Sequence, residues 1–150
     1  MPQSFVKNYI HIVFSTKNRQ PFIDKSIKSE LHAYLGGICK EVGCPVITTG
    51  GVEDHVHILC MLSKRISLSE LVRTIKANSS KWMKTQGAQY ANFYWQRGYG
   101  GFSVNPLKAE VVKKYIENQK EHHKNRTFKE EYHLFLKKYE IAYDEQYVWD

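Results

Sequence analysis

The chain has 150 residues, of which 42% are hydrophobic, and its 22 lysines and arginines against 15 acidic residues leave a net charge of +7. No apolar run approaches the roughly 18 residues that a membrane span requires, and the N-terminus lacks the charged-then-apolar pattern of an export signal. We therefore expect one domain, residues 1–150, in a cytoplasmic protein with no membrane partner. Three cysteines without CxxC spacing fit reduced thiols, and the positive charge favours a nucleic-acid partner.

The first part of the chain predicts a strand followed by a helix. Residues 5–15 are rich in β-branched and aromatic side chains, which predicts a first strand. Asp24 is a good N-cap, and apolar residues follow it at helical spacing, so a helix is expected from there to about Gly43. Residues 44–49 predict a second strand, with Gly50-Gly51 as the turn that follows it.

The third predicted strand is the most informative stretch of the sequence. From Val56 to Leu62 it is almost wholly apolar, which is typical of a central strand buried on both faces. It begins with His55 and His57, and these two side chains share one face because side chains alternate along a strand. Two imidazoles on one face of a rigid strand form a suitable metal clamp. On its own, the pair also fits two ordinary histidines.

After this strand the pattern predicts a long helix and an interrupted strand. Ser67 and Glu70 fit a capping box, and apolar residues at helical spacing continue to about residue 86. Residues 93–96 predict the start of a fourth strand, which glycines then interrupt. These glycines are Gly98, Gly100 and Gly101. Because glycine admits unusual backbone angles, they form a possible hinge before the next helix. The alternative is a plain bulged strand end.

The last third of the chain is predicted to be helical. Asn105-Pro106 predicts the start of a helix that reaches about Lys124, and a shorter helix is expected over residues 128–138. The order of elements is then β-α-β-β-α-β followed by helices. This order predicts an α+β, ferredoxin-like fold, in which an antiparallel sheet carries two helices on one face and leaves the other face open for a site.

A third metal ligand is expected from the helices near the C-terminus. His122-His123 is set aside because adjacent helical residues do not face the same way. Tyr115 and Gln119 are four residues apart, so they share one helix face and could bring a phenol and an amide oxygen to the histidine pair. The alternative is that Tyr115 is a half-buried packing residue.

Four segments resemble one family of DNA enzymes. Residues 51–59 resemble the HUH motif, which is histidine, hydrophobic residue, histidine on a strand. Residues 115–119 resemble the tyrosine-bearing helix of single-tyrosine HUH transposases, the small TnpA-like enzymes of bacterial and archaeal insertion sequences, which include the REP-associated tyrosine transposases. Residues 11–17 and 93–99 also resemble that family.

The resemblance implies a transposase that cleaves and rejoins single-stranded DNA at insertion-sequence ends. It implies that His55, His57 and Gln119 hold one Mg²⁺ or Mn²⁺ ion. Tyr115 would attack a DNA phosphate to give a 5′-phosphotyrosine bond and a free 3′-hydroxyl, which later rejoins strands without ATP. It also implies a homodimer that reads subterminal hairpins, and the family often shares its active sites between subunits.

The chemistry of these residue types agrees with the resemblance. A free phenol has a pKa near ~10, so Tyr115 needs help to act as a nucleophile, and a divalent ion on the phosphate would favour in-line displacement. Two imidazoles and an amide are neutral ligands, so they would leave the ion its full charge. Asp54, with the opposite strand parity, is expected to orient its neighbours.

Eight basic residues are candidate DNA contacts, and together they predict binding that weakens steeply with salt. They are Lys17, Arg19, Lys64, Arg65, Arg73, Lys76, Lys81 and Arg97. Three alternatives stay open. Residues 97–104 begin like the RNA-recognition signature, although on the wrong strand, which would make the protein a non-catalytic nucleic-acid-binding module. A hydrolytic nuclease and a replication initiator or relaxase are the others.

Overall fold

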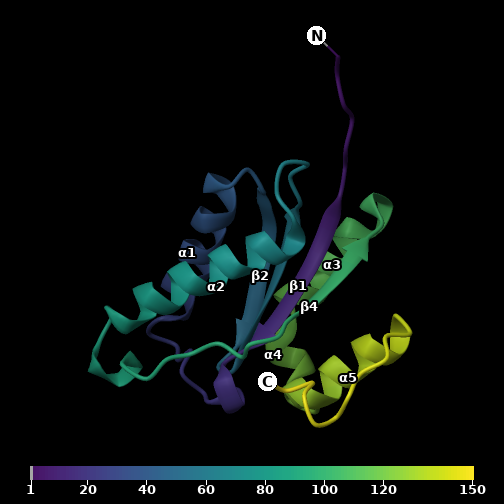
Figure 1. The fold of residues 1–150 in the computed structure, drawn as a ribbon. Helices are drawn as coiled ribbons and strands as arrows, with labels where there is room; N and C mark the ends of the chain where they lie inside the picture. The colour runs from purple at the N-terminus through teal and green to yellow at the C-terminus, as the bar shows by residue number, and fades with distance from the viewer. Residues whose placement is uncertain (1) are drawn as a thin grey trace.

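The computed structural model describes residues 2–150 and is built around a four-stranded antiparallel sheet (Figure 1). Its strands are β1 (Tyr9–Ser15), β2 (Val46–Val52), β3 (His55–Met61) and β4 (Gly100–Val104), in the order β2-β3-β1-β4. The predicted α+β class is confirmed, and β1 and β3 occupy the centre as expected. Ser15 pairs with His55, so β1 ends where β3 begins.

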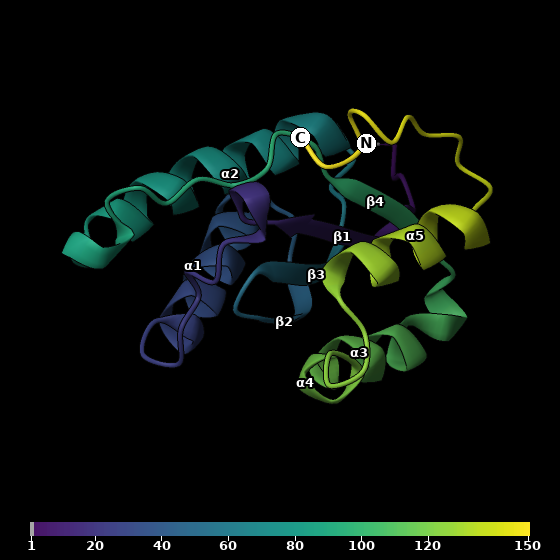
Figure 2. The same ribbon diagram turned by 90° about the horizontal axis from the view of Figure 1, so that it is seen from below.

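Helices cover both faces of the sheet (Figure 2). One face carries α1 (Lys28–Glu41) and α2 (Leu68–Lys84), and the other carries α3 (Ala109–Glu117), α4 (Gln119–His122) and α5 (Phe128–Lys138). Three 3₁₀ turns complete the fold: η1 (Lys17–Arg19), η2 (Ala88–Tyr90) and η3 (Pro106–Lys108). The face expected to stay open is therefore covered by the C-terminal helices. Within residues 2–150, no helix is long and apolar enough to cross a membrane.

The two helical layers explain why the central strands are apolar on both sides. Ile12, Phe14 and Ile58 belong to the main core under α1 and α2. Val13 packs instead against α5, and Leu59 packs against α3. Because alternate residues face opposite layers, a central strand here has no solvent-facing side and its sequence loses the usual alternation.

Short polar side chains start the helices close to the expected positions. The Ser67 hydroxyl accepts the backbone N–H of Glu70 at 3.1 Å at the start of α2. Thr127 and Glu130 form a complete capping box at the start of α5. Helix α1 begins at Lys28, later than predicted, because the Asp24 carboxylate caps a separate turn before it.

Gly50 and Gly51 lie inside β2, so the predicted turn is wrong; the chain reverses at residues 53–54. Gly50 is needed where α3 crosses the sheet, since a Cβ at that position would lie 2.3 Å from the carbonyl oxygen of Ile116. The residue type that suggested a turn instead permits close approach of a helix backbone. This contact brings the tyrosine-bearing helix down onto β2.

The predictions for the fourth strand and the next helix are also corrected. Strand β4 starts at Gly100, and residues 93–96 contribute only an isolated bridge from Trp95 to Thr16. The glycines at 100 and 101 pair with β1, so they form no hinge. The helix expected from residue 105 to 124 is broken at Asn118, whose backbone angles (φ −98°, ψ 23°) separate α3 from α4.

Candidate active site

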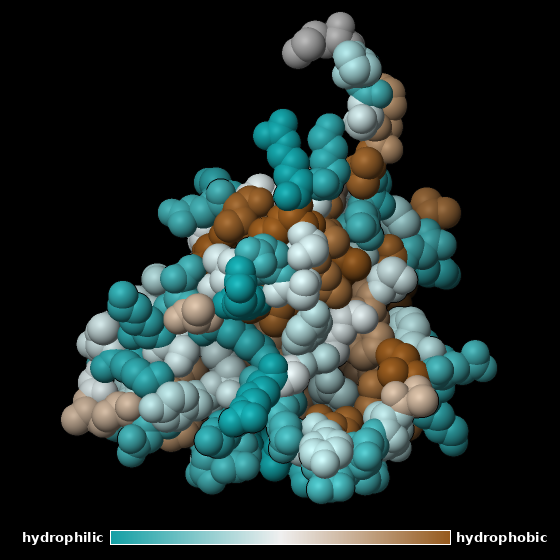
Figure 3. Space-filling view, in the orientation of Figure 1, coloured by the Kyte–Doolittle hydropathy of each residue, from teal (hydrophilic) through white to brown (hydrophobic). Residues whose placement is uncertain are grey.

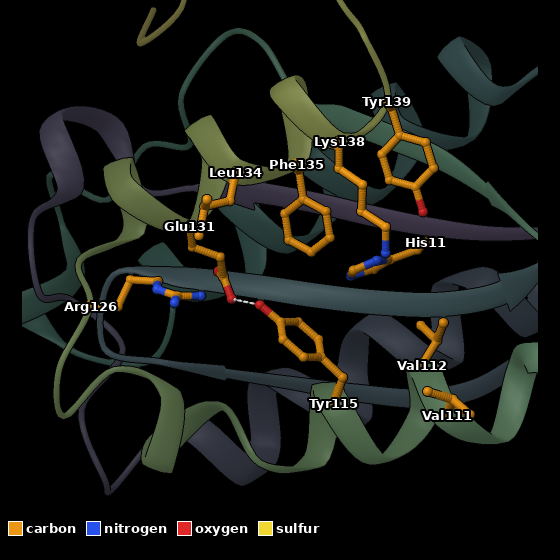
Figure 4. A pocket seen from close by; sticks show the side chains of 10 residues that line it. All are labelled: His11, Val111, Val112, Tyr115, Arg126, Glu131, Leu134, Phe135, Lys138 and Tyr139. Carbon is orange, nitrogen blue, oxygen red and sulfur yellow. Dashed lines mark hydrogen bonds between the residues drawn. The ribbon is translucent and has the colours of Figure 1, made fainter.

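The two histidines of β3 point toward the C-terminal helices and are completely buried. His55 Nε2 lies 3.0 Å from the side-chain oxygen of Gln119 at the start of α4. Tyr115 on α3 reaches the same place, and its hydroxyl donates a hydrogen bond to Glu131 on α5 (Figure 4). Side chains from one strand and three helices therefore meet at the end of the sheet where β3 begins.

Glu131 is the centre of this arrangement. Its side chain is 1% exposed, and its Oε1 lies 3.1 Å from His57 Nε2, 3.4 Å from His55 Nε2 and 3.2 Å from His123 Nε2. Its other oxygen accepts hydrogen bonds from Tyr115 and from the Gln119 amide, the latter at 3.1 Å. One buried carboxylate thus contacts every residue that the sequence grouped as the site.

Glu131 was not among the ligands predicted from the sequence, which were all neutral. A local signal existed, because Glu131 lies three residues after Phe128 and four before Phe135, on the apolar stripe of α5. A carboxylate at that position is expensive to bury unless it is paired. An acidic residue on the apolar face of an amphipathic helix therefore indicates a partner elsewhere in the fold.

His123 was set aside in the sequence analysis, yet it contributes to the site. Its Nδ1 lies 2.6 Å from the carbonyl oxygen of Arg126, which holds the ring so that Nε2 lies 3.0 Å from the Gln119 side-chain oxygen. His122 has a different role, because its ring packs over Tyr115 with centroids 4.4 Å apart. The two neighbours do face different ways, as expected, but each reaches a different part of the same site.

A second layer of polar groups holds the two strand histidines in position. Asp54 contacts His55 Nδ1 at 2.8 Å, and His11 Nε2 contacts His57 Nδ1 at 2.7 Å. In each case one ring nitrogen is held from behind and Nε2 is directed toward Glu131. This is the usual way in which proteins orient imidazole ligands. The expected orienting role of Asp54 agrees with this contact.

The four central groups have shifted pKa values. Burial opposes charge on His55, but the hydrogen bonds that its ring donates to Asp54 and Glu131 outweigh it and raise its pKa to about 9. Burial dominates at His57 and lowers its pKa to about 4. Burial would raise the pKa of Glu131, yet its histidine partners hold that pKa far below the usual range. Burial, together with the charge of Glu131, raises the pKa of Tyr115.

This donor set fits a divalent ion. The ligand atoms of His55, His57 and Glu131 lie within 4.8 Å of one another, and all three side chains are buried. The Gln119 oxygen adds a fourth donor beside them. Imidazole ligands suit transition-metal ions, and the two oxygen ligands suit Mn²⁺ and Mg²⁺.

The eight predicted DNA contacts are spread over the molecule, and Figure 3 shows hydrophilic side chains over much of the face that α2 forms. Lys17 and Arg19 lie on η1, beside the end of the sheet that carries the site. Lys64 and Arg65 follow the opposite end of β3. The remaining four are Arg73, Lys76 and Lys81 on α2 and Arg97 before β4.

Lys76 has a structural role within this group. Its ammonium donates hydrogen bonds to the carbonyl oxygens of Gln96, Arg97 and Gly98 at 2.7, 3.1 and 2.5 Å. Burial lowers the pKa of Lys76 to about 8. Lys76 therefore ties α2 to the segment before β4, and the DNA-binding role of all eight residues stays a prediction.

Known proteins resemble this chain along most of its length. The family model described as IS200-like transposase matches residues 4–119. The ISDra2 transposase TnpA of Deinococcus radiodurans is 25% identical over 114 residues, which cover 73% of this chain and 81% of that protein. A crystal structure from D. radiodurans R1, described as a candidate transposase, superposes with a TM-score of 0.61 at 20% identity, covering 79% of this chain and 96% of the other.

A REP-associated tyrosine transposase bound to a REP hairpin also superposes with a TM-score of 0.61, at 14% identity, covering 82% of this chain and 73% of that one. At these identities the two structures show a shared fold. The match of the family model over more than two thirds of the sequence decides the assignment. The chain belongs to the family of IS200-like DNA transposases.

Proposed function

We propose that this transposase cleaves single-stranded DNA with Tyr115 as the nucleophile and with His55 and His57 as metal ligands. The observation that carries the proposal is the convergence of the Tyr115 hydroxyl and both His Nε2 atoms on the carboxylate of Glu131. Membership of a DNA-cleaving and DNA-rejoining family supports it. A tyrosine that only packed in the core would not bring its hydroxyl to a group of metal ligands.

His55, His57, Gln119 and Glu131 are the residues that would hold the ion, which we propose to be Mn²⁺ or Mg²⁺. When bound, such an ion neutralises the oxygens of the scissile phosphate and favours in-line displacement. Asp54 holds His55 from behind, so that its ring stays directed at the site. Glu131 adds a carboxylate to the expected set of neutral ligands, which would strengthen the attraction for a cation.

The reaction is a transesterification. The Tyr115 oxygen forms a bond to phosphorus, the bond from phosphorus to the 3′ oxygen breaks, and the phenolic proton ends on the departing 3′-hydroxyl. Glu131 already accepts the hydrogen bond from this phenol, so it is the group positioned to orient the Tyr115 oxygen for the attack. Because the 5′-phosphotyrosine ester conserves the phosphodiester bond, a later attack by a 3′-hydroxyl rejoins DNA without ATP.

We propose that the DNA partner is a single strand with subterminal hairpins, which agrees with the REP hairpin bound by the structural relative. The rings of Tyr115 and His57 lie close within one chain, with centroids 6.0 Å apart, which supports a site built from the residues of a single chain. The homodimer therefore stays a prediction about how two DNA ends are paired. A module of the RNA-recognition type is disfavoured, since buried histidines under α5 occupy the central strand where that module exposes aromatic side chains.

One gel tests the proposal. Purified protein is incubated with a pool of end-labelled random-sequence single strands in Mn²⁺, denatured and resolved by size. We expect a labelled protein band that EDTA and Tyr115→Phe abolish and that Tyr147→Phe, a change at an exposed tyrosine, leaves intact. A band that persists in Tyr115→Phe, or cutting without any covalent band, would refute the nucleophile.

A further inference from the structure

A groove between α3 and α5 runs directly to the proposed nucleophile (Figure 4). Its cavity has a volume of about 270 Å³. Val111, Val112 and Tyr115 line the groove from α3, and Phe135 lines it from α5. The phenolic end of Tyr115 points along the groove toward Glu131, so a group joined to that oxygen has this cavity beside it.

We infer that this groove binds the nucleotide that stays attached to Tyr115 after cleavage, as a deoxynucleoside 5′-phosphate. The inference rests on the proposed function, because the 5′ polarity of the adduct places a sugar and a base one phosphate away from the tyrosine oxygen. A group on so short a tether must lie in the space next to Tyr115. The volume lies just below the usual range for ligand pockets, so the groove has room for one nucleotide at most.

The walls of the groove match the two halves of a nucleotide. Phe135 offers an aromatic surface for a base, and its own ring is held by stacking on Phe102 with centroids 5.2 Å apart. Arg126 and Lys138 line the rim with positive charge. Within residues 2–150, neither of these cations forms an ion pair with a carboxylate, so both are available to a phosphate.

Charge also argues against a second copy of this chain as the occupant. Val111 and Leu134 are 63% and 47% exposed, so the groove has an apolar edge that another protein could cover. Two unpaired cations at that edge would then face a chain of net charge +7, which is unfavourable. An anionic ligand with an apolar part satisfies both features of the surface.

The test uses thymidine 5′-monophosphate with the metal-free protein in EDTA, followed by ¹³C-methyl NMR. We expect saturable shifts of the methyl signals of Val111, Val112 and Leu134. Thymidine without phosphate, and deoxyribose 5-phosphate without a base, should each bind about fivefold more weakly. Absence of shifts at these methyls, or equal binding of all three compounds, overturns the inference. Methyl shifts that change with protein concentration in the absence of nucleotide also overturn the inference, because they indicate that a second copy of the chain occupies the groove.

Matched variants make the test specific. Val111→Trp fills the groove and should abolish the shifts, whereas Leu107→Trp, on the preceding turn and 89% exposed, should leave them unchanged. Lys138→Ala should weaken binding, and its neighbour Lys137→Ala should not. Equal effects within either pair would overturn the inference. If a covalent DNA adduct forms but the mononucleotide does not bind, the inference about the groove is refuted and the proposed function stands. If the mononucleotide binds but no adduct forms, the proposed function is refuted.

Discussion

Replacement of Glu131 by alanine is the most informative perturbation of this site. The side chain is 1% exposed and contacts three imidazoles, a phenol and an amide. Its removal leaves His57 Nε2 and the Gln119 amide without this partner and removes one of the two acidic neighbours of a charged His55. We therefore expect Glu131→Ala to destabilise the metal-free protein strongly.

The expected loss in the free energy of unfolding follows from the burial of the Glu131 carboxylate. Removing one partner of a buried charge network typically costs about 3–5 kcal/mol. For a chain of this length that corresponds to a fall in Tm of roughly 10 °C. Since small proteins have a total stability of about 5–15 kcal/mol, the variant should still fold. Urea unfolding in EDTA at pH 7, followed by circular dichroism, measures the change.

A matched control separates this effect from the loss of any glutamate. Glu117 lies on the surface of α3 and approaches Lys113 only at 3.9 Å, so Glu117→Ala should cost less than about 0.5 kcal/mol. Glu131→Gln keeps the shape and removes the charge. If Glu131→Ala costs no more than the Glu117 control, the carboxylate does not hold the site together and the reasoning is refuted.

Stability should also depend on pH through His55. Its folded pKa of about 9 lies above the unfolded value of 6.5, so its contribution is complete below about pH 6.5 and disappears as the pH rises through 9. That rise in pKa corresponds to roughly 3 kcal/mol. Urea midpoints of the metal-free protein should therefore fall between pH 6.5 and 9.5. The same fall in Glu131→Gln would contradict the proposed pairing.

Three further predictions concern the metal, the fold and the subunits. Mn²⁺ binding measured by calorimetry should weaken about tenfold per pH unit below pH 9, because the His55 proton must leave; pH-independent binding would exclude His55 as a ligand. Gly50→Ala should cost about 1–3 kcal/mol in urea unfolding because its Cβ meets the α3 backbone, whereas Gly36→Ala, with open space around it, should not destabilise. A mixture of His57→Ala and Tyr115→Phe should form no adduct on the labelled DNA, since both residues act within one chain; restored adduct would indicate sites shared between chains.

The position of α3 shows how the fold serves the chemistry. Helix α3 crosses the sheet where Gly50 removes the side chain that would hold it away, and Ile116 packs there into a small core with Leu59. Because Tyr115 directly precedes Ile116, this packing places Tyr115 beside the site that contains His55 and His57. The break at Asn118 then lets Gln119 start a separate helix against His55.

Several features were predictable because they depend on neighbours in the sequence. The two-residue period of a strand places His55 and His57 on one face, and the apolar run that follows them indicates burial on both sides. Local capping chemistry predicts the start of the helix at Ser67. These signals need no knowledge of the rest of the fold, so the central strands and the helix over residues 128–138 follow from the sequence.

Other features depended on partners that are distant in the sequence. Glycines at 100 and 101 suggest an interruption, yet pairing with β1 makes them part of a strand, because ladder hydrogen bonds outweigh a weak local preference. The place of Glu131 on the apolar stripe of α5 indicates only that it has some partner, and the sheet then brings His57, 74 residues away, to 3.1 Å from it. The sequence by itself therefore determined the paired imidazoles and the helix that carries the tyrosine. Only the tertiary structure decided which buried carboxylate joins them, because the cost of burying that charge is met by groups from three other elements.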